Sequence, residues 1–387
     1  MAERALAHVE KIEWIRPIEG ADNIELIGVL GWVCIAKNGE FNVGDMAVYI
    51  EIDSKCPETD ERFAFLANKK FKVKTMKLGK FKVISQGLAL PLSLFPELQD
   101  KNIGDDVTEA LNITYASEED AARKTNKVDS NAKYKSMAKR RPKLFANPIV
   151  RRIMRYSIGR KIMFLLFGRK KDNPKKFPDW IIKTDETRIE NAPFYLQSTE
   201  KWIKTEKCDG TSCTFAVDRL KKGKNKFDFI VCSRNVRQAD REQACYHESN
   251  IYWELADKYD IEKILTQFAT ENNYNRVVLQ GEGVGSVQGN PYKFTENKLF
   301  VFNLIIDGIR LGTVEMADFC KSHGLTSVPI IDTAYELPKT MEEMKLEADG
   351  YSELNPKVKR EGFVYRSIDG QQSFKNVSRE YLLKHNG

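Results

Sequence analysis

The chain has 387 residues, of which 42% are hydrophobic and 10% aromatic, and its formal net charge is +7. This length predicts two or three domains, and this composition excludes a disordered chain because it is rich enough for packed cores. The longest apolar run, Ile162–Gly168, is far shorter than the ~18 residues of a membrane-spanning helix, and the first residues lack the apolar core of a signal peptide. We therefore expect a soluble, intracellular protein without a membrane partner.

The cysteines and histidines indicate neither a metal site nor a disulfide framework. The seven cysteines contain no C-x-x-C pair, and the four histidines lie apart from one another. Zinc sites and disulfide-rich domains need closer or more regular spacing. The distribution favours a reducing compartment.

The first 113 residues form a series of short alternating segments separated by Gly, Asn and Asp turns. We expect strands within the stretches 8–18, 24–36, 46–53, 69–91 and 103–111. Strands at this spacing, with no long helix between them, predict a small antiparallel barrel, and the length suits an OB-fold. Residues 1–113 are therefore predicted to be an OB-fold module, and such a barrel binds nucleic acid when its exposed face is equipped for it.

One stretch of this module alternates lysine with aromatic and apolar residues. It is FKVKTMKLGKFKV, residues 71–83, which contains Phe71 and Phe81. The lysines in and beside it are Lys70, Lys72, Lys74, Lys77, Lys80 and Lys82. Such a mixture is typical of a platform for single-stranded nucleic acid, and it also fits an ordinary hairpin with a solvated lysine face.

The positive charge is concentrated in the next segment. Between Arg123 and Lys183 there are 20 lysines and arginines against three acidic residues, so this segment carries +17 and the rest of the chain −10. Such a segment is typical of a solvated linker or of a surface that binds a phosphate backbone, and both interpretations stay open. Apolar residues at helical spacing near 147–171 predict a basic, partly helical connector over residues 114–176.

From residue 177 to 387 strand and helix patterns mix. Helical periodicity is found at 249–272 and 313–324, and the other apolar stretches alternate in the strand period. Because the strands do not alternate regularly with crossover helices, the pattern predicts an α+β domain with antiparallel sheets.

A lysine stands in an unusual place in this domain. Lys207 lies in TEKCDGTSCTFAV, residues 205–217, where one predicted strand ends and the turn CDG leads into the next. A turn lysine beside a turn aspartate is the ordinary explanation of K-x-D-G, so this short pattern needs support from elsewhere in the chain.

Further polar and aromatic residues follow in a fixed order. They are Arg234 and Asn235 in CSRNV, Glu282 in LQGEGVG, Phe300 and Phe302 in LFVFN, Glu361 and Arg366 in EGFVYR, and Lys375 in SFKNV. Each alone has an ordinary structural explanation. Together, in this order, they resemble the complete motif set of the covalent nucleotidyltransferase superfamily, which contains ligases and mRNA capping enzymes.

The resemblance implies two antiparallel sheets flanked by helices and a set of catalytic roles. Lys207 would be the nucleophile that forms a phosphoramide bond to AMP, which requires a deprotonated amine, and neighbouring cations and a divalent metal would lower its pKa. Lys375 would be the second cation at the α-phosphate. Asp209, Glu282 and Glu361 would hold Mg²⁺ or Mn²⁺ directly or through its waters.

The same resemblance implies a binding site for ATP. Phe302 would stack on the base, Glu206 would meet the base edge, and Arg234 and Asn235 would bind ribose and phosphates. Phe300 is the alternative stacking residue because strand alternation puts both rings on one face; Asn303 after Phe302 matches the family pattern and favours Phe302. Gly210 and Gly281 would let the backbone approach the nucleotide.

Two features narrow the resemblance to RNA ligases. KTDETRIEN, Lys183–Asn191, is similar to the segment that precedes the nucleophile in nick-sealing RNA ligases, where the residue matching Arg188 serves the nucleotide or the RNA end. DNA ligases and capping enzymes carry an OB domain after the last lysine motif, whereas here the barrel comes first and Lys375 lies 12 residues before the last residue. This order resembles ATP-dependent RNA ligases with an N-terminal OB module, the fifth RNA ligase family.

This family implies a function in RNA repair. The enzyme would seal 3′-OH/5′-phosphate nicks with RNA on the 3′-OH side, through lysyl-AMP and an AMP-capped 5′-phosphate, and its partner would be a nicked RNA or RNA/DNA duplex. We expect a monomer, with the adenylyltransferase domain at 177–387. The alternatives are a DNA ligase, a capping-type nucleotidyltransferase, or a non-catalytic nucleic-acid-binding relative.

Overall fold

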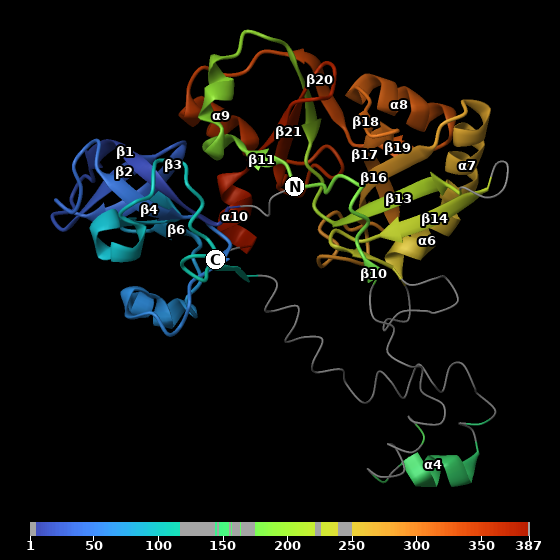
Figure 1. Cartoon of the computed structure of the whole chain (residues 1–387), viewed down its shortest axis with the longest axis horizontal. Coiled ribbons are helices and arrows are strands. Elements are labelled where there is room, and N and C mark those ends of the chain that lie inside the picture. Colours follow the sequence, from blue (N-terminus) through green and yellow to red (C-terminus); the bar gives the residue numbers. More distant parts are fainter. Residues whose placement is uncertain are drawn as a thin grey trace.

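The computed structural model describes residues 5–116, 147–154, 175–220, 226–238 and 250–385, together with residues 144, 156 and 163 (Figure 1). Most of the predicted basic connector lies outside the described residues. Within it, helix α4 (Pro148–Met154) forms where helical spacing was expected.

The N-terminal module is a curled antiparallel sheet, as the sequence predicts (Figure 1, blue). Its strand order is β3-β2-β1-β4-β8, with β1 (Ala7–Pro17), β2 (Ile24–Val29), β3 (Trp32–Lys37), β4 (Met46–Ile50) and β8 (Leu88–Pro91). β1 pairs with β4 through its first half and with β2 through its second, and a register shift between Ile12 and Trp14 lies at the start of the pairing with β2. A bulge of this kind bends a strand, so one strand serves both sides of the barrel.

Short elements complete the module. They are the pair β5 (Ser54–Lys55) and β9 (Thr114–Tyr115), the hairpin β6 (Thr75–Leu78) and β7 (Val83–Gln86), and the 3₁₀ helices η1 (Glu61–Lys69), η2 (Leu92–Leu94) and η3 (Pro96–Leu98). The regular strand expected at 103–111 is wrong: an isolated bridge joins Asp106 to His8, and the backbone of residues 104–107 bonds to Ala7 and Val9 of β1. The side chains of Asp105 and Asp106 accept hydrogen bonds from the N–H groups of Asn102 and Thr108, and such local bonds compete with strand pairing.

The C-terminal domain contains two larger sheets. The first has the order β10-β15-β14-β13-β16-β17-β18, with β19 added beside β17. Its strands are β10 (Lys175–Lys176), β13 (Thr211–Arg219), β14 (Phe227–Cys232), β15 (Val236–Arg237), β16 (Arg276–Val284), β17 (Lys298–Ile306), β18 (Ile309–Arg310) and β19 (Thr326–Ser327). All pairs are antiparallel except β17 with β19.

Three helices cover this sheet: α6 (Ile251–Lys258), α7 (Ile261–Glu271) and α8 (Thr313–Ser322). They bury Leu255, Leu265 and Met316 against Phe215 and Leu279 of the strands. The single helix expected near 249–272 is two helices, because the chain turns at Asp260, whose φ of +49° is left-handed.

The second sheet has the order β11-β22-β21-β12-β20. Its strands are β11 (Thr187–Arg188), β12 (Trp202–Glu206), β20 (Ile330–Tyr335), β21 (Gly362–Ser367) and β22 (Ser373–Val377), flanked by η4 (Ile189–Asn191), η5 (Pro193–Gln197), α9 (Met341–Ala348) and α10 (Arg379–His385). Only β11 and β22 pair in parallel. The predicted α+β class, with two largely antiparallel sheets, is confirmed.

The N-terminal module packs directly on the second sheet. Leu382 of α10 joins the barrel core beside Ile12 and Ile27, and Figure 1 shows α10 between the barrel and the rest of the domain. The indole N–H of Trp32 donates to the side chain of Asn191 (2.5 Å). Among the described residues, none of the helices combines the length and hydrophobicity needed to cross a membrane.

Candidate active site

A pocket of about 710 Å³ lies where the N-terminal module meets both sheets of the C-terminal domain. Its walls include residues from β12, β16, β17, β21, β22 and α10, and the barrel contributes Asp53, Lys72, Lys74 and Tyr115. Two lysines of the predicted nucleic-acid platform therefore face this pocket. Phe71 instead packs against the barrel core, and the ring of Phe81 lies under Lys80.

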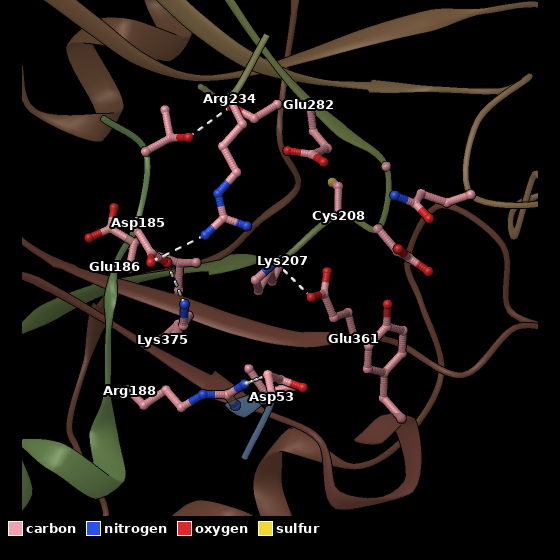
Figure 2. Close-up of a pocket in the computed structure, with 18 of the residues that line it drawn as sticks. Asp53, Asp185, Glu186, Arg188, Lys207, Cys208, Arg234, Glu282, Glu361 and Lys375 are labelled. Carbon is pink, nitrogen blue, oxygen red and sulfur yellow. Dashed lines mark hydrogen bonds and ion pairs between the residues drawn. The ribbon is translucent and has the colours of Figure 1, made fainter. Parts of the chain in front are cut away.

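Lys207 lies at the centre of the pocket (Figure 2). Every residue of the preceding strand β12 is buried, and the N–H of Lys207 donates to the carbonyl of Gly362 on β21 (3.0 Å). These contacts fix the backbone, so the side chain leaves the sheet at a defined point. Its Nζ pairs with Glu361 Oε1 at 2.7 Å.

Carboxylates dominate the electrostatics around this amine. Burial lowers the pKa of Lys207, but Glu361, Glu282 and Asp209 outweigh burial, and the net shift is upward. Burial also raises the pKa of Glu361, and it raises that of Glu282 to about 8, helped by the neighbouring Glu361 and Asp209. The expected lowering of the lysine pKa by neighbouring cations is therefore not achieved by the side chains themselves.

The three predicted metal ligands surround Lys207 without forming a closed cage. Among the described residues, no three His, Cys, Asp or Glu side chains converge closely enough to hold a metal ion by themselves. The N–H of Asp209 donates to Tyr292 Oη (2.7 Å), which fixes the turn after the lysine. The set offers hard oxygen donors and excess negative charge, so it fits a hydrated divalent cation contacted partly through water.

Gly210 and Gly281, near this turn, pack closely against neighbouring strands. A Cβ on Gly210 would lie 2.4 Å from the carbonyl oxygen of Gly283, so the K-x-D-G turn needs glycine to pass the neighbouring strand. A Cβ on Gly281 would meet Leu299 and Phe300 on β17 at 2.8 Å, and Gly281 does not line the pocket. Gly281 therefore allows close packing of β16 against β17, instead of the expected approach of the backbone to a nucleotide.

The two cations predicted to bind phosphates are held by one aspartate. Lys375 Nζ donates to Asp185 Oδ1 (2.7 Å), and Arg234 Nη2 pairs with Asp185 Oδ2 at 3.2 Å (Figure 2). Arg188 lies further into the wall, where its Nη2 pairs with Asp53 of the barrel at 3.2 Å. In the described part of the chain, its Nε and Nη1 are buried without a hydrogen-bond partner, which suits an anionic ligand.

The residues predicted to contact the base and the ribose differ in whether they line the pocket. Phe302 lines the pocket, whereas Phe300 is buried and does not. Glu206 also lines the pocket, but its two carboxylate oxygens accept from Ser352 Oγ and from the N–H of Glu353 (2.7 Å), so it anchors that loop. Asn235 is exposed and is not among the lining residues.

Comparisons with known proteins agree with this geometry. An OB-fold family model matches residues 6–92, and an RNA ligase family model matches residues 200–384. A structure of a Naegleria gruberi RNA ligase variant with ATP and Mn is 30% identical, with a TM-score of 0.75, over 99% of this chain and 100% of that one. The chain belongs to the RNA ligase family.

Other structures of the same Naegleria gruberi enzyme resemble this ligase as closely. A variant with AMP and Mn and a complex with pyrophosphate are each 30% identical, with TM-scores of 0.74, over 99% of both chains. A comparison with curated protein sequences gives no match.

Two acidic residues of the pocket of this ligase were not predicted from the sequence. Asp185 and Glu186 line the pocket, and Glu186 accepts from Arg366 Nη2 (3.1 Å) and from Ser373 Oγ. Burial opposes ionisation of Glu186, but Arg366, Ser373 and Arg310 outweigh it, so its pKa is lowered. Both acids belong to KTDETRIEN, the segment in which only Arg188 was assigned a role.

Proposed function

We propose that this ligase uses ATP to seal nicks between a 3′-OH and a 5′-phosphate, with RNA on the 3′-OH side. The observation that carries the proposal is the Lys207 amine, paired with Glu361 in a pocket that also contains Asp209, Glu282 and the cations Lys375 and Arg234. The similar Naegleria gruberi structures with ATP and Mn, with AMP and Mn, and with pyrophosphate support the same chemistry.

In the first step Lys207 Nζ attacks the α-phosphate of ATP, forming the N–P bond of lysyl-AMP as the bond to pyrophosphate breaks. Glu361 accepts a hydrogen bond from the amine and orients it for this attack. Lys375 stabilises the charge that builds on the α-phosphate, and Arg234 and Arg188 bind the phosphates. AMP then passes to the 5′-phosphate, and the 3′-OH attacks that end and releases AMP.

Asp209, Glu282 and Glu361 would hold Mg²⁺ or Mn²⁺, partly through water. Such a cation supplies positive charge that offsets the carboxylates around Lys207 and lowers the pKa of its amine. Without it, the same carboxylates keep the amine protonated, and a protonated amine has no electron pair for attack.

Phe302 would stack on the adenine, since it is the phenylalanine of β17 that lines the pocket. Glu206 would act on the base edge together with the loop that it anchors at Ser352 and Glu353. Asn235, exposed beside Arg234, would contact the nucleotide only from the rim of the pocket.

The proposed substrate is a nicked RNA or RNA/DNA duplex. Residues 1–113 would grip its backbone, helped by the lysines in and beside the β6–β7 hairpin and by the basic connector 114–176. Residues 177–387 would carry out adenylylation and sealing, and the enzyme would act as a monomer. The barrel precedes the nucleotidyltransferase motifs, which argues against a DNA ligase or a capping enzyme.

The first experiment labels the enzyme with radioactive ATP or GTP and Mg²⁺. We expect an adduct with ATP that is stable to alkali and labile to acid, as a phosphoramide bond is, none with Lys207→Ala, and none when EDTA removes the metal. Lys201→Ala is the matched control, because Lys201 is exposed, pairs with Glu336 and lies outside the pocket. An adduct on Lys207→Ala, or labelling by GTP alone, would contradict the proposal.

The second experiment offers duplexes with one nick and with RNA or DNA on each side of it. We expect sealing whenever RNA provides the 3′-OH. Equal sealing with DNA at the 3′-OH would remove the claim of RNA specificity while leaving lysine adenylylation intact.

A further inference from the structure

Asp185 occupies the position between the two phosphate-binding cations of the pocket. Its Oδ1 accepts from Lys375 Nζ at 2.7 Å and its Oδ2 pairs with Arg234 Nη2 at 3.2 Å. The two cations come from different sheets: Lys375 from β22, and Arg234 from the loop between β14 and β15. One carboxylate therefore bridges the pocket, with one oxygen for each cation, as two phosphate oxygens would (Figure 2).

We propose that Asp185 is an internal anion that pairs with Lys375 and Arg234 until a nucleotide polyphosphate exchanges with it. The inference deepens the proposed function, on which it rests for the phosphate-binding role of the two cations. Asp185 is thus a positioning residue: it holds both cations at the pocket in the absence of ATP and limits how tightly other anions bind.

The residues beside Asp185 are anchored, so the exchange involves its side chain. Thr184 Oγ1 shares a hydrogen bond with Ser212 Oγ (2.8 Å), and Glu186 is held by Arg366 and Ser373. Arg188 is buried against Asp53. With the backbone fixed on both sides, rotation of the Asp185 side chain opens the position between the cations.

Solvent exposure makes this exchange inexpensive in free energy. The side chains of Asp185 and Arg234 are 32% and 49% exposed, and that of Lys375 is 11% exposed. Ion pairs with this much contact with water contribute little, so a polyphosphate with several charges can replace one carboxylate. The carboxylate that leaves stays nearby and repels the incoming phosphates.

Neutralising Asp185 should therefore strengthen anion binding. The probe is inorganic pyrophosphate, titrated calorimetrically in EDTA into the full-length enzyme, so that neither metal nor turnover contributes. We expect Asp185→Asn to lower the pyrophosphate Kd between about three- and tenfold, because it removes the carboxylate that competes for Lys375 and Arg234 and that repels the phosphates. Asp185→Glu, which keeps the charge, should stay within about twofold of wild type.

Asp228→Asn is the matched control. Asp228 on β14 pairs with Arg237 on β15 at 3.1 Å, outside the pocket. Loss of its charge should therefore leave the pyrophosphate Kd unchanged. A pyrophosphate Kd that is unchanged or raised in Asp185→Asn, in protein whose melting temperature matches wild type, overturns the inference. If Asp185→Asn melts lower, the Asp185→Ser variant replaces it under the same criterion. Absence of a Lys207 adduct in wild type would instead count against the proposed function, independently of the pyrophosphate result.

Discussion

The buried pair of Lys345 and Glu190 should be among the most sensitive points of the fold. Lys345 Nζ on α9 donates to Glu190 Oε1 (2.6 Å) and to the carbonyl of Val377 (2.7 Å). The side chains are 1% and 0% exposed. Glu190 lies in η4, two residues after Arg188. The backbone carbonyl of Glu190 accepts a hydrogen bond from the N–H of Gly31 in the barrel (2.8 Å). The pair thus holds together α9, β22 and the wall of the pocket.

Lys345→Met keeps most of the side-chain volume and removes both hydrogen bonds. It leaves the Glu190 carboxylate buried without its counter-ion, a change that costs about 3–5 kcal/mol. For a domain of this size, that cost lowers the melting temperature by roughly 6–20 °C. Differential scanning calorimetry of the full chain, with urea unfolding followed by tryptophan fluorescence, measures both quantities.

A double variant separates the charge from the packing. Replacing Glu190 by Leu in the Lys345→Met background removes the unpaired carboxylate, so we expect it to recover at least half of the lost stability. The reasoning is refuted if Lys345→Met costs less than about 1 kcal/mol, since an intact buried ion pair cannot be broken that cheaply. It is also refuted if the double variant is no more stable than the single one.

Two further predictions concern the barrel and the base site. Burial alone would lower the pKa of His8, but Glu10 and Glu51 outweigh it and raise the pKa to about 9. The contribution of protonated His8 to the free energy of unfolding is therefore full below the pKa of His8 in the unfolded chain, about 6.5, and is lost as the pH rises through 9. The stability gap between wild type and His8→Gln, from urea unfolding, should therefore shrink by about 3 kcal/mol between pH 6 and pH 10, and a constant gap would contradict the assignment. In adenylylation kinetics, Phe302→Leu should raise the KM for ATP roughly tenfold by weakening base stacking, whereas Phe300→Leu should change it less than about twofold; equal effects would argue against Phe302 as the stacking residue.

Local patterns predicted much of the fold. Short apolar runs with β-branched and aromatic residues in 46–53 and in 211–217 produced strands β4 and β13, in which consecutive residues on both faces are buried. The strand expected at 103–111 failed because aspartate side chains compete for backbone N–H groups there. The break between α6 and α7 was missed because hydrophobic periodicity continues across Asp260.

The candidate site could be predicted only in part, for a different reason. Lys207, Glu282 and Lys375 each belong to short motifs whose order along the chain identifies the family, and the pocket contains all three. The motif set did not include Asp185, because its importance comes from cations on two different sheets. No local pattern records such a bridge; only the packing of β22 beside β11 brings Lys375 to the segment that carries Asp185.

Helix α10 connects the N-terminal barrel to the pocket around Lys207. Its consecutive residues Tyr381 and Leu382 serve two regions. Leu382 is buried in the barrel core, Tyr381 packs partly against that core, and both line the pocket. There, burial and the nearby Glu361 and Asp209 carboxylates raise the pKa of the Tyr381 phenol. Because one turn of helix joins the barrel core to the carboxylates around Lys207, a shift of the barrel must move Tyr381 as well.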